Sequence, residues 1–118
     1  MNIKAQIFLL SQYKEMDSAY WGLGTSVSSS IYFALCTHQP GKSSRFFSHN
    51  PGGKKITPLF SLADHIRTES KSLPQGKVHT PIFEGEDNLL YFGTHFAYPY
   101  GKPQTVNYEG GHMASYDP

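Results

Sequence analysis

Two stretches of the sequence decide the predicted fold: residues 31–36, Ile-Tyr-Phe-Ala-Leu-Cys, and residues 90–95, Leu-Tyr-Phe-Gly-Thr-His. Both are rich in aromatic and branched side chains, which pack well on the pleated surface of a strand. Each begins with an aliphatic residue followed by tyrosine and phenylalanine. We therefore interpret them as two copies of one strand and as the centre of an internal repeat.

The repeat extends on the C-terminal side of both strands. A Thr-His pair closes the second stretch at residues 94–95, and another follows the first stretch at residues 37–38. Residues 45–51, Arg-Phe-Phe-Ser-His-Asn-Pro, then correspond to residues 112–118, His-Met-Ala-Ser-Tyr-Asp-Pro. The copies are 59 residues apart at the tyrosine and 67 apart at the final proline, which a two-residue deletion and a ten-residue insertion explain. A period of about 60 residues with about four short strands is typical of a β-propeller blade.

The composition of the chain supports a turn-rich β fold. It contains 118 residues, enough for one domain, with 14% aromatic residues, 11 glycines and 8 prolines. A coiled coil or a helical bundle would be rich in Ala, Leu, Glu and Lys, and a disordered tail would have fewer aromatics. With a net charge of +1 the chain has no basic patch for phosphates, so we expect no nucleic-acid partner.

The cysteine count and the hydropathy pattern exclude further classes. Cys36 is the single cysteine of the sequence, so neither a disulfide framework nor a cysteine-based zinc site is expected. The longest apolar stretch near the N-terminus is residues 7–10, which is too short for a secretory signal or a membrane span. We expect no membrane partner, and the compartment stays open.

Other segments have patterns typical of short antiparallel strands joined by turns. Residues 50–53, Asn-Pro-Gly-Gly, predict a turn, because proline fixes its φ and glycine accepts a positive φ. Pro58 cannot donate a ladder hydrogen bond, which places the strand at residues 54–59 on a sheet edge. Residues 61–70 have the spacing of one short helix, which Ser61 caps. The remaining expectations are strands at 77–83, 89–94 and 111–116, a strand and a turn at 21–30, and either a short helix or a frayed strand at 1–20.

The aromatic strands and the Asx-Pro ending resemble blades of the Kelch, YVTN and PQQ-like propeller group. The second copy also resembles uncharacterised bacterial propellers with a blade of Tyr-Phe-Gly-Thr-His, Gly-Gly-His and Tyr-Asp-Pro, here residues 91–95, 110–112 and 116–118. The resemblance covers residues 25–118 and implies an all-β fold of antiparallel blades with one short helix in the connection between them. The implied boundaries are an N-terminal segment at 1–24, a first partial blade at 25–60, a connection at 61–76 and a second partial blade at 77–118.

The resemblance also implies an incomplete ring. A closed propeller needs at least about four blades, and this sequence holds fewer than two. We therefore expect it to be a piece of a longer protein, with the remaining blades as its partners. The alternative is a ring that other chains complete, and the total number of blades stays open.

The predicted functional face is the top of the blades, where propellers usually bind ligands. His79, His95 and His112 fall at the top ends of three adjacent strands of the second blade. Since neighbouring strands lie about 4.8 Å apart, these imidazoles could converge on a divalent metal or an anionic ligand. Convergence requires His95 and His112 to point to the same face, with ring nitrogens within about 8 Å. The alternative is that each ring caps a strand end by hydrogen bonding to a loop carbonyl.

Further ligand-binding candidates surround these histidines. Arg45 begins the third strand of the first blade and would supply a cation, and His38 and His65 are expected on the same rim. The inserted loop of the second copy carries Tyr98, Tyr100 and Tyr108, whose amphipathic rings suit a sugar. These tyrosines could instead pack the loop onto a neighbouring blade.

The leading functional hypothesis is a ligand-binding or interaction scaffold that acts through the top face, on a carbohydrate or a small acidic ligand. The alternative is an enzyme, a metal-assisted lyase or hydrolase acting on an acidic carbohydrate, as a resemblance to propeller lyases implies. The sequence has no glycine-rich phosphate loop and no Gly-x-Ser-x-Gly elbow. It does not decide between binding and catalysis, and a divalent metal is the one cofactor that it suggests.

Overall fold

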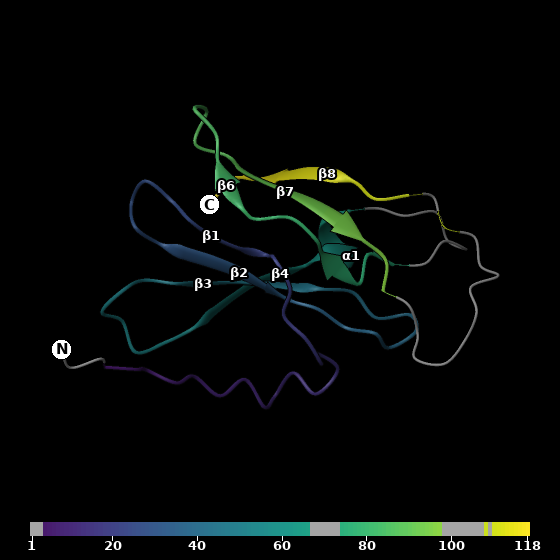
Figure 1. Ribbon diagram of the computed structural model, residues 1–118, viewed down its shortest axis with the longest axis horizontal. Coiled ribbons are helices and arrows are strands. Elements are labelled where there is room, and N and C mark those ends of the chain that lie inside the picture. Colours follow the sequence, from purple (N-terminus) through teal and green to yellow (C-terminus); the bar gives the residue numbers. More distant parts are fainter. Residues whose placement is uncertain (1–3, 67–73, 98–107, 109) are drawn as a thin grey trace.

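The computed structural model describes residues 4–66, 74–97, 108 and 110–118, and within them the chain forms two antiparallel sheets lying one above the other (Figure 1). The predicted all-β class, with one short helix, is confirmed in this part of the chain. The first sheet is a meander in which each strand pairs with the next. Its strands are β1 (Leu23–Thr25), β2 (Ile31–Leu35), β3 (Arg45–His49) and β4 (Thr57–Ser61).

The second sheet is built around one central strand. The strands are β5 (Lys77–Val78), β6 (Phe83–Glu84), β7 (Leu90–His95) and β8 (Met113–Tyr116). Strands β5 and β6 lie one after the other along one side of β7, and β8 lies along the other side. The strand expected at 77–83 is thus interrupted, because the Thr80 hydroxyl accepts a hydrogen bond from the Gly93 amide at 2.7 Å and Pro81 has no amide hydrogen to donate.

The strand register matches the internal repeat. Tyr32 of β2 pairs with Ser48 of β3, and Tyr91 of β7 pairs with Ser115 of β8. These are the residues that the sequence alignment of the two copies brings into correspondence. The two Thr-His pairs occupy different positions relative to their strands. Residues 94–95 are the last two residues of β7, whereas residues 37–38 come after β2 has ended at Leu35. The assignment of the two sheets to propeller blades stays a prediction.

The hydrophobic core lies between the two sheets. Phe46 of β3 is fully buried, with its ring centroid 4.5 Å from that of Phe92 on β7 and 4.8 Å from that of Phe60 on β4. Aromatic rings at these separations contribute beyond the area that they bury. The buried members of this core are Tyr32, Ala34, Phe46, Leu62, Val78, Ile82, Leu90 and Phe92.

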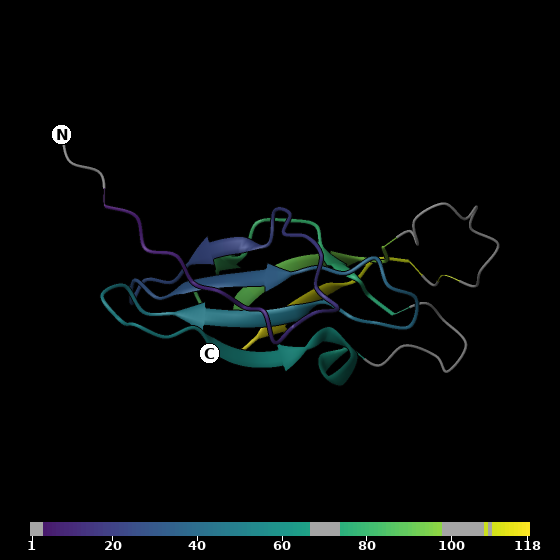
Figure 2. The ribbon, with the colours of Figure 1, turned by 90° about the horizontal axis from the view of Figure 1, so that it is seen from below.

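The N-terminal segment covers the other face of the first sheet. Figure 2 shows it crossing in front of β2 and β3. Tyr13 packs edge-on against Phe47 at 5.0 Å, and Glu15 forms an ion pair with Arg45 at 3.2 Å. The described residues before β1 form neither the short helix nor the strand that we considered, apart from a single bridge between Ser18 and Cys36.

The short helix α1 (Leu62–His65) follows β4 directly. It begins as predicted at Ser61, whose hydroxyl accepts a hydrogen bond from the Ala63 amide at 3.3 Å. Residues 67–70 of the expected helix lie outside the described residues. No helix of the described part of the chain has the length and hydrophobicity that a membrane span requires.

Candidate functional site

The candidate site is centred on Tyr20, which precedes β1 and contacts a residue beside the first sheet and residues of the second. Its hydroxyl lies 3.2 Å from Nε2 of His38, and its ring packs edge-on to the ring of His79 at 5.8 Å. The ammonium group of Lys77 lies 4.3 Å from the centroid of the same ring, within the range of a cation–π interaction. Tyr20 therefore joins a histidine beside the first sheet to a lysine and a histidine on the second.

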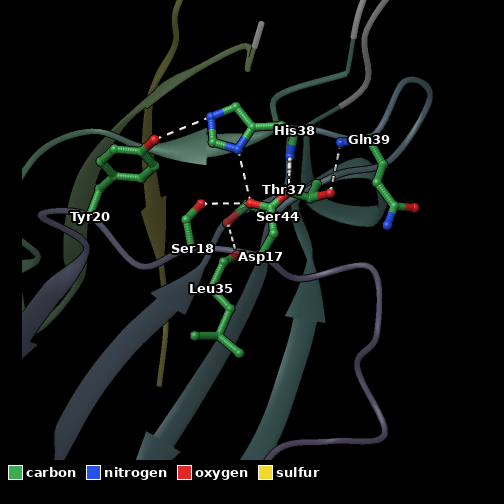
Figure 3. Close-up of polar contacts among 8 residues, drawn as sticks. All are labelled: Asp17, Ser18, Tyr20, Leu35, Thr37, His38, Gln39 and Ser44. Atoms are coloured by element: carbon green, nitrogen blue, oxygen red, sulfur yellow. Dashed lines mark hydrogen bonds and ion pairs between the residues drawn. The ribbon is translucent and has the colours of Figure 1, made fainter. Parts of the chain in front are cut away.

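Tyr20 contacts one ring nitrogen of His38, and Asp17 contacts the other (Figure 3). One carboxylate oxygen lies 2.9 Å from Nδ1 of His38, and the other accepts the His38 backbone amide at 3.0 Å. Partial burial acts to raise the pKa of the Asp17 carboxyl, but hydrogen bonds from His38 and Ser18 outweigh it and hold this pKa below its ordinary value. The result is an ionised carboxylate that fixes the orientation of a buried imidazole.

Strand register explains why the second sheet supplies Lys77, His79 and His95 together. Lys77 pairs with His95, and the His79 amide donates to the Gly93 carbonyl at 2.9 Å. Residues directly opposite each other share a face, and so do residues two apart on one strand. All three side chains therefore lie on the outer face of the sheet, and the rings of His79 and His95 are 5.6 Å apart.

His112 is not brought to this cluster. It lies opposite Thr94, whose amide donates to the His112 carbonyl at 2.9 Å. Since side chains alternate along a strand, His112 shares the face of Thr94, whereas the neighbouring His95 points to the opposite face. No three His, Cys, Asp or Glu side chains among the described residues are placed to hold a metal ion. The required convergence of His79, His95 and His112 is therefore not formed in the described structure, and two of the three predicted ligands meet without the third.

The other predicted ligand-binding residues lie elsewhere or outside the described residues. Arg45 is on the outer face of the first sheet, where it pairs with Glu15 and lies 5.6 Å from the ring of Tyr13, so it is not with the histidines. Tyr98 and Tyr100 lie outside the described residues.

Tyr108, the third tyrosine predicted on the inserted loop, is among the described residues and does reach these histidines. The Tyr108 hydroxyl accepts a hydrogen bond from the Phe96 amide at 3.2 Å, and the Tyr108 ring lies 5.6 Å from that of His95. Tyr108 therefore borders the cluster from the side of the second sheet that carries His95.

The remaining histidines have structural partners. Nε2 of His65 donates to the Ser115 carbonyl at 2.7 Å, which ties α1 to β8, and its ring stacks on Phe60. His49 lies at the opposite end of β3 from Arg45, and its Nδ1 is 3.0 Å from the Lys55 carbonyl oxygen. His95 has such a partner as well, since its Nδ1 lies 2.6 Å from the Phe96 carbonyl oxygen. All three rings therefore match the alternative interpretation, in which histidines bond to backbone carbonyls.

A shallow apolar depression adjoins Tyr20. Trp21 lines this depression and is 68% exposed, whereas tryptophan side chains are on average largely buried. An exposed indole next to polar groups is a surface on which a flat or ring-shaped ligand can stack. The lining residues are Ala19, Tyr20, Trp21, Leu23 and Pro81.

The sequence did not point to Tyr20 or Asp17. Both lie in the segment before the first strand, for which the sequence left a short helix and a frayed strand open, and they are 18 and 21 residues from His38. Their contact with His38 depends on the bridge between Ser18 and Cys36, which no short motif specifies.

Comparisons of this chain with protein-family models, with curated proteins and with solved structures found no match. The site is therefore interpreted from its own geometry. We name Tyr20, His38, Lys77, His79 and His95 the tyrosine–histidine cluster. It offers hydrogen-bond donors, groups that are or can become cationic, and one exposed aromatic surface at its border.

Proposed function

We propose that the chain is a ligand-binding module and that the tyrosine–histidine cluster is its binding surface. The single observation that carries this proposal is the placement of Lys77, His79 and His95 on one face of the second sheet, with Lys77 and His79 against the ring of Tyr20. An ammonium group attracts negative charge, and imidazoles add hydrogen bonds and, once protonated, further positive charge. The geometry supports a small acidic ligand.

An acidic carbohydrate fits these groups better than a simple anion. The depression beside Tyr20 places the exposed Trp21 next to the cluster, so a sugar ring could stack on the indole while its carboxylate faces Lys77. Amphipathic rings suit sugars because one face is apolar and the edge can meet polar groups. A ligand with both features would use the whole surface.

Calorimetric titration with trigalacturonate and with the neutral cellotriose tests this proposal. We expect the acidic sugar to bind and the neutral sugar to bind more weakly. The double substitution Lys77→Ala with His79→Ala should weaken acidic-sugar binding by more than about tenfold, the effect of one lost charge-assisted hydrogen bond. The matched control is Lys54→Ala with His49→Ala, which removes the same residue types away from the cluster and should leave binding unchanged. Equal loss in both double variants would contradict the proposal.

A metal-assisted lyase or hydrolase acting on an acidic carbohydrate is the second candidate. The observation in its favour is the 5.6 Å separation of the His79 and His95 rings, which suits two ligands of one divalent ion. A third ligand would have to come from outside this pair, since His112 lies on the other face. Zinc titration of the protein and of the His95→Ala variant, followed by imidazole NMR shifts, separates this function from metal-free binding.

A further inference from the structure

The chain of hydrogen bonds through His38 has a defined direction. The Asp17 carboxylate is ionised and can only accept, so the 2.9 Å contact requires a hydrogen on Nδ1 of His38. A neutral imidazole with its hydrogen on Nδ1 has a lone pair at Nε2. The Tyr20 hydroxyl, 3.2 Å away, is then the donor to Nε2. The order of groups is therefore hydroxyl, imidazole and carboxylate.

We propose that Tyr20 is an activated nucleophile, with His38 as its general base and Asp17 as the residue that positions His38. This proposal goes beyond ligand binding, because it assigns the cluster a group-transfer step. A hydroxyl beside an imidazole that a carboxylate orients is the arrangement by which weak nucleophiles become reactive. The substrate class is an acyl donor such as an ester carried by the bound ligand.

The acyl group passes first to Tyr20 and then to water. The Tyr20 oxygen attacks the acyl carbon and forms a new carbon–oxygen bond, while the hydroxyl proton passes to Nε2 of His38. The bond to the leaving alkoxide then breaks, and His38 gives its proton to the departing oxygen. Water subsequently attacks the acylated tyrosine with His38 again as the base, which releases the acid and restores Tyr20.

Exposure selects the tyrosine oxygen as the reacting atom. Tyr20 is 40% exposed, whereas His38 is 8% exposed and lies behind it. An incoming electrophile therefore reaches the Tyr20 side chain more readily than the His38 side chain. The ammonium group of Lys77 over the Tyr20 ring attracts the negative charge that the phenolic oxygen gains as its proton passes to His38.

Tyr91 provides an internal control. Its hydroxyl donates directly to the Asp87 carboxylate at 2.6 Å, and this hydrogen bond raises the pKa of Tyr91. Both tyrosines are thus hydrogen-bonded to a neighbouring polar group, but only Tyr20 has an imidazole that can accept its proton in the proposed step. The structure predicts a reactive Tyr20 and an unreactive Tyr91 in the same molecule.

Covalent labelling with phenylmethanesulfonyl fluoride tests the proposal. The tyrosine oxygen forms a bond to sulfur, fluoride leaves, and His38 takes the proton, so the adduct reports the same first step. Peptide mass spectrometry at neutral pH should show Tyr20 labelled faster than Tyr91 by about tenfold or more. His38→Gln and Asp17→Asn should each reduce the Tyr20 rate to that of Tyr91.

The pH profile of labelling distinguishes activation from a structural effect of the substitutions. In the unmodified protein the Tyr20 rate should fall at acid pH, because a protonated imidazole can no longer accept the tyrosine proton. Asp17→Asn should remove this step. The profile of the unmodified protein needs no substitution, so it tests the proposal even where a variant fails to fold.

Three outcomes would overturn the proposal: equal rates at Tyr20 and Tyr91, an Asp17→Asn variant with the unmodified rate and pH profile, or the adduct on His38. Labelling is done without a ligand, so its result is separate from the calorimetric test of binding. Slow Tyr20 labelling with intact sugar binding rejects the nucleophile and leaves the binding module. Fast Tyr20 labelling without sugar binding rejects the binding module and leaves the nucleophile.

Discussion

The two sheets are built from the same repeat, yet they bury opposite faces of it. In the first sheet Tyr32 and Ala34 of β2 face the core, whereas in the second sheet Leu90 and Phe92 of β7 do so. The repeat aligns Tyr32 with Tyr91, which points to the outer face. A sandwich with two-fold symmetry would pack equivalent faces together, so these sheets pack head to tail.

Head-to-tail packing is the geometry that blades stacked around a common axis require, because each blade then meets its neighbours through two different faces. It supports the predicted relation to propellers, which stays a prediction. It also shows that burial is decided by the neighbour and not by the repeat alone. Phe46 is fully buried between the sheets, and its counterpart Met113 is 70% exposed on the outer face.

The largest expected effect comes from substituting this pair. Phe46→Ala should lower the free energy of unfolding by about 3–5 kcal/mol, because it removes an aromatic ring packed between the sheets. Met113→Ala at the corresponding position should change it by less than about 0.5 kcal/mol. Urea unfolding followed by fluorescence measures both. A large loss of unfolding free energy for Met113→Ala would show that the outer face is covered in solution. The two positions would then not differ in burial.

A smaller effect is expected at the closest approach of the two sheets. Gly24 of β1 faces Ile82, and a Cβ added at Gly24 would lie 1.8 Å from the Ile82 carbonyl oxygen. Gly24→Ala should therefore destabilise the fold by about 1–3 kcal/mol, the usual cost of overpacking. Thr25→Ala is the control, since the next residue of β1 points away from the second sheet and is exposed.

Thermal unfolding of the two variants measures this difference. If Gly24→Ala and Thr25→Ala unfold at the same temperature, β1 does not pack as tightly on the second sheet as the close approach requires. The repeat counterpart of Gly24 is Phe83 of β6, which lies opposite Tyr91 as Gly24 lies opposite Tyr32. A phenylalanine is tolerated there because it is on the exposed outer face.

The strands were predictable because local patterns specify them. The aromatic and branched residues of β2, β3 and β7 predicted their positions within one residue or so, and Ser61 marked the start of α1. The break between β5 and β6 was not foreseen, because it depends on a side-chain hydrogen bond from another strand.

The site was less predictable than the strands. Alternation along β7 and β8 was available from the sequence, but the register that separates His95 from His112 was not, since it depends on which residues pair. Tyr20 and Asp17 meet His38 through tertiary contacts alone. The sequence thus predicted a group of His79, His95 and His112, of which the structure brings the first two rings to 5.6 Å and leaves the third on the other face.

The smallest expected effect compares two carboxyl groups, one beside each sheet. The pKa of Asp17 is held low by His38 and Ser18 against the opposing effect of partial burial, and that of Asp87 is lowered chiefly by the Tyr91 hydroxyl. A carboxyl whose pKa is lower in the folded state stabilises the fold at pH values above its unfolded value. That stabilisation is lost as the pH falls through the folded value.

For both groups the loss should begin below the ordinary aspartate value of 3.8. Asp17→Asn should flatten the acid side of the stability profile, because the Asp17 carboxylate is partly buried and accepts several hydrogen bonds. Asp87→Asn should leave the profile almost unchanged, since this pair is exposed to solvent and water replaces a lost partner. Urea midpoints measured between about pH 5 and pH 2 test the difference. An Asp17→Asn variant that keeps the original acid slope would show that Asp17 titrates alike in the folded and unfolded chains, and the fixed carboxylate behind His38 would then be wrong.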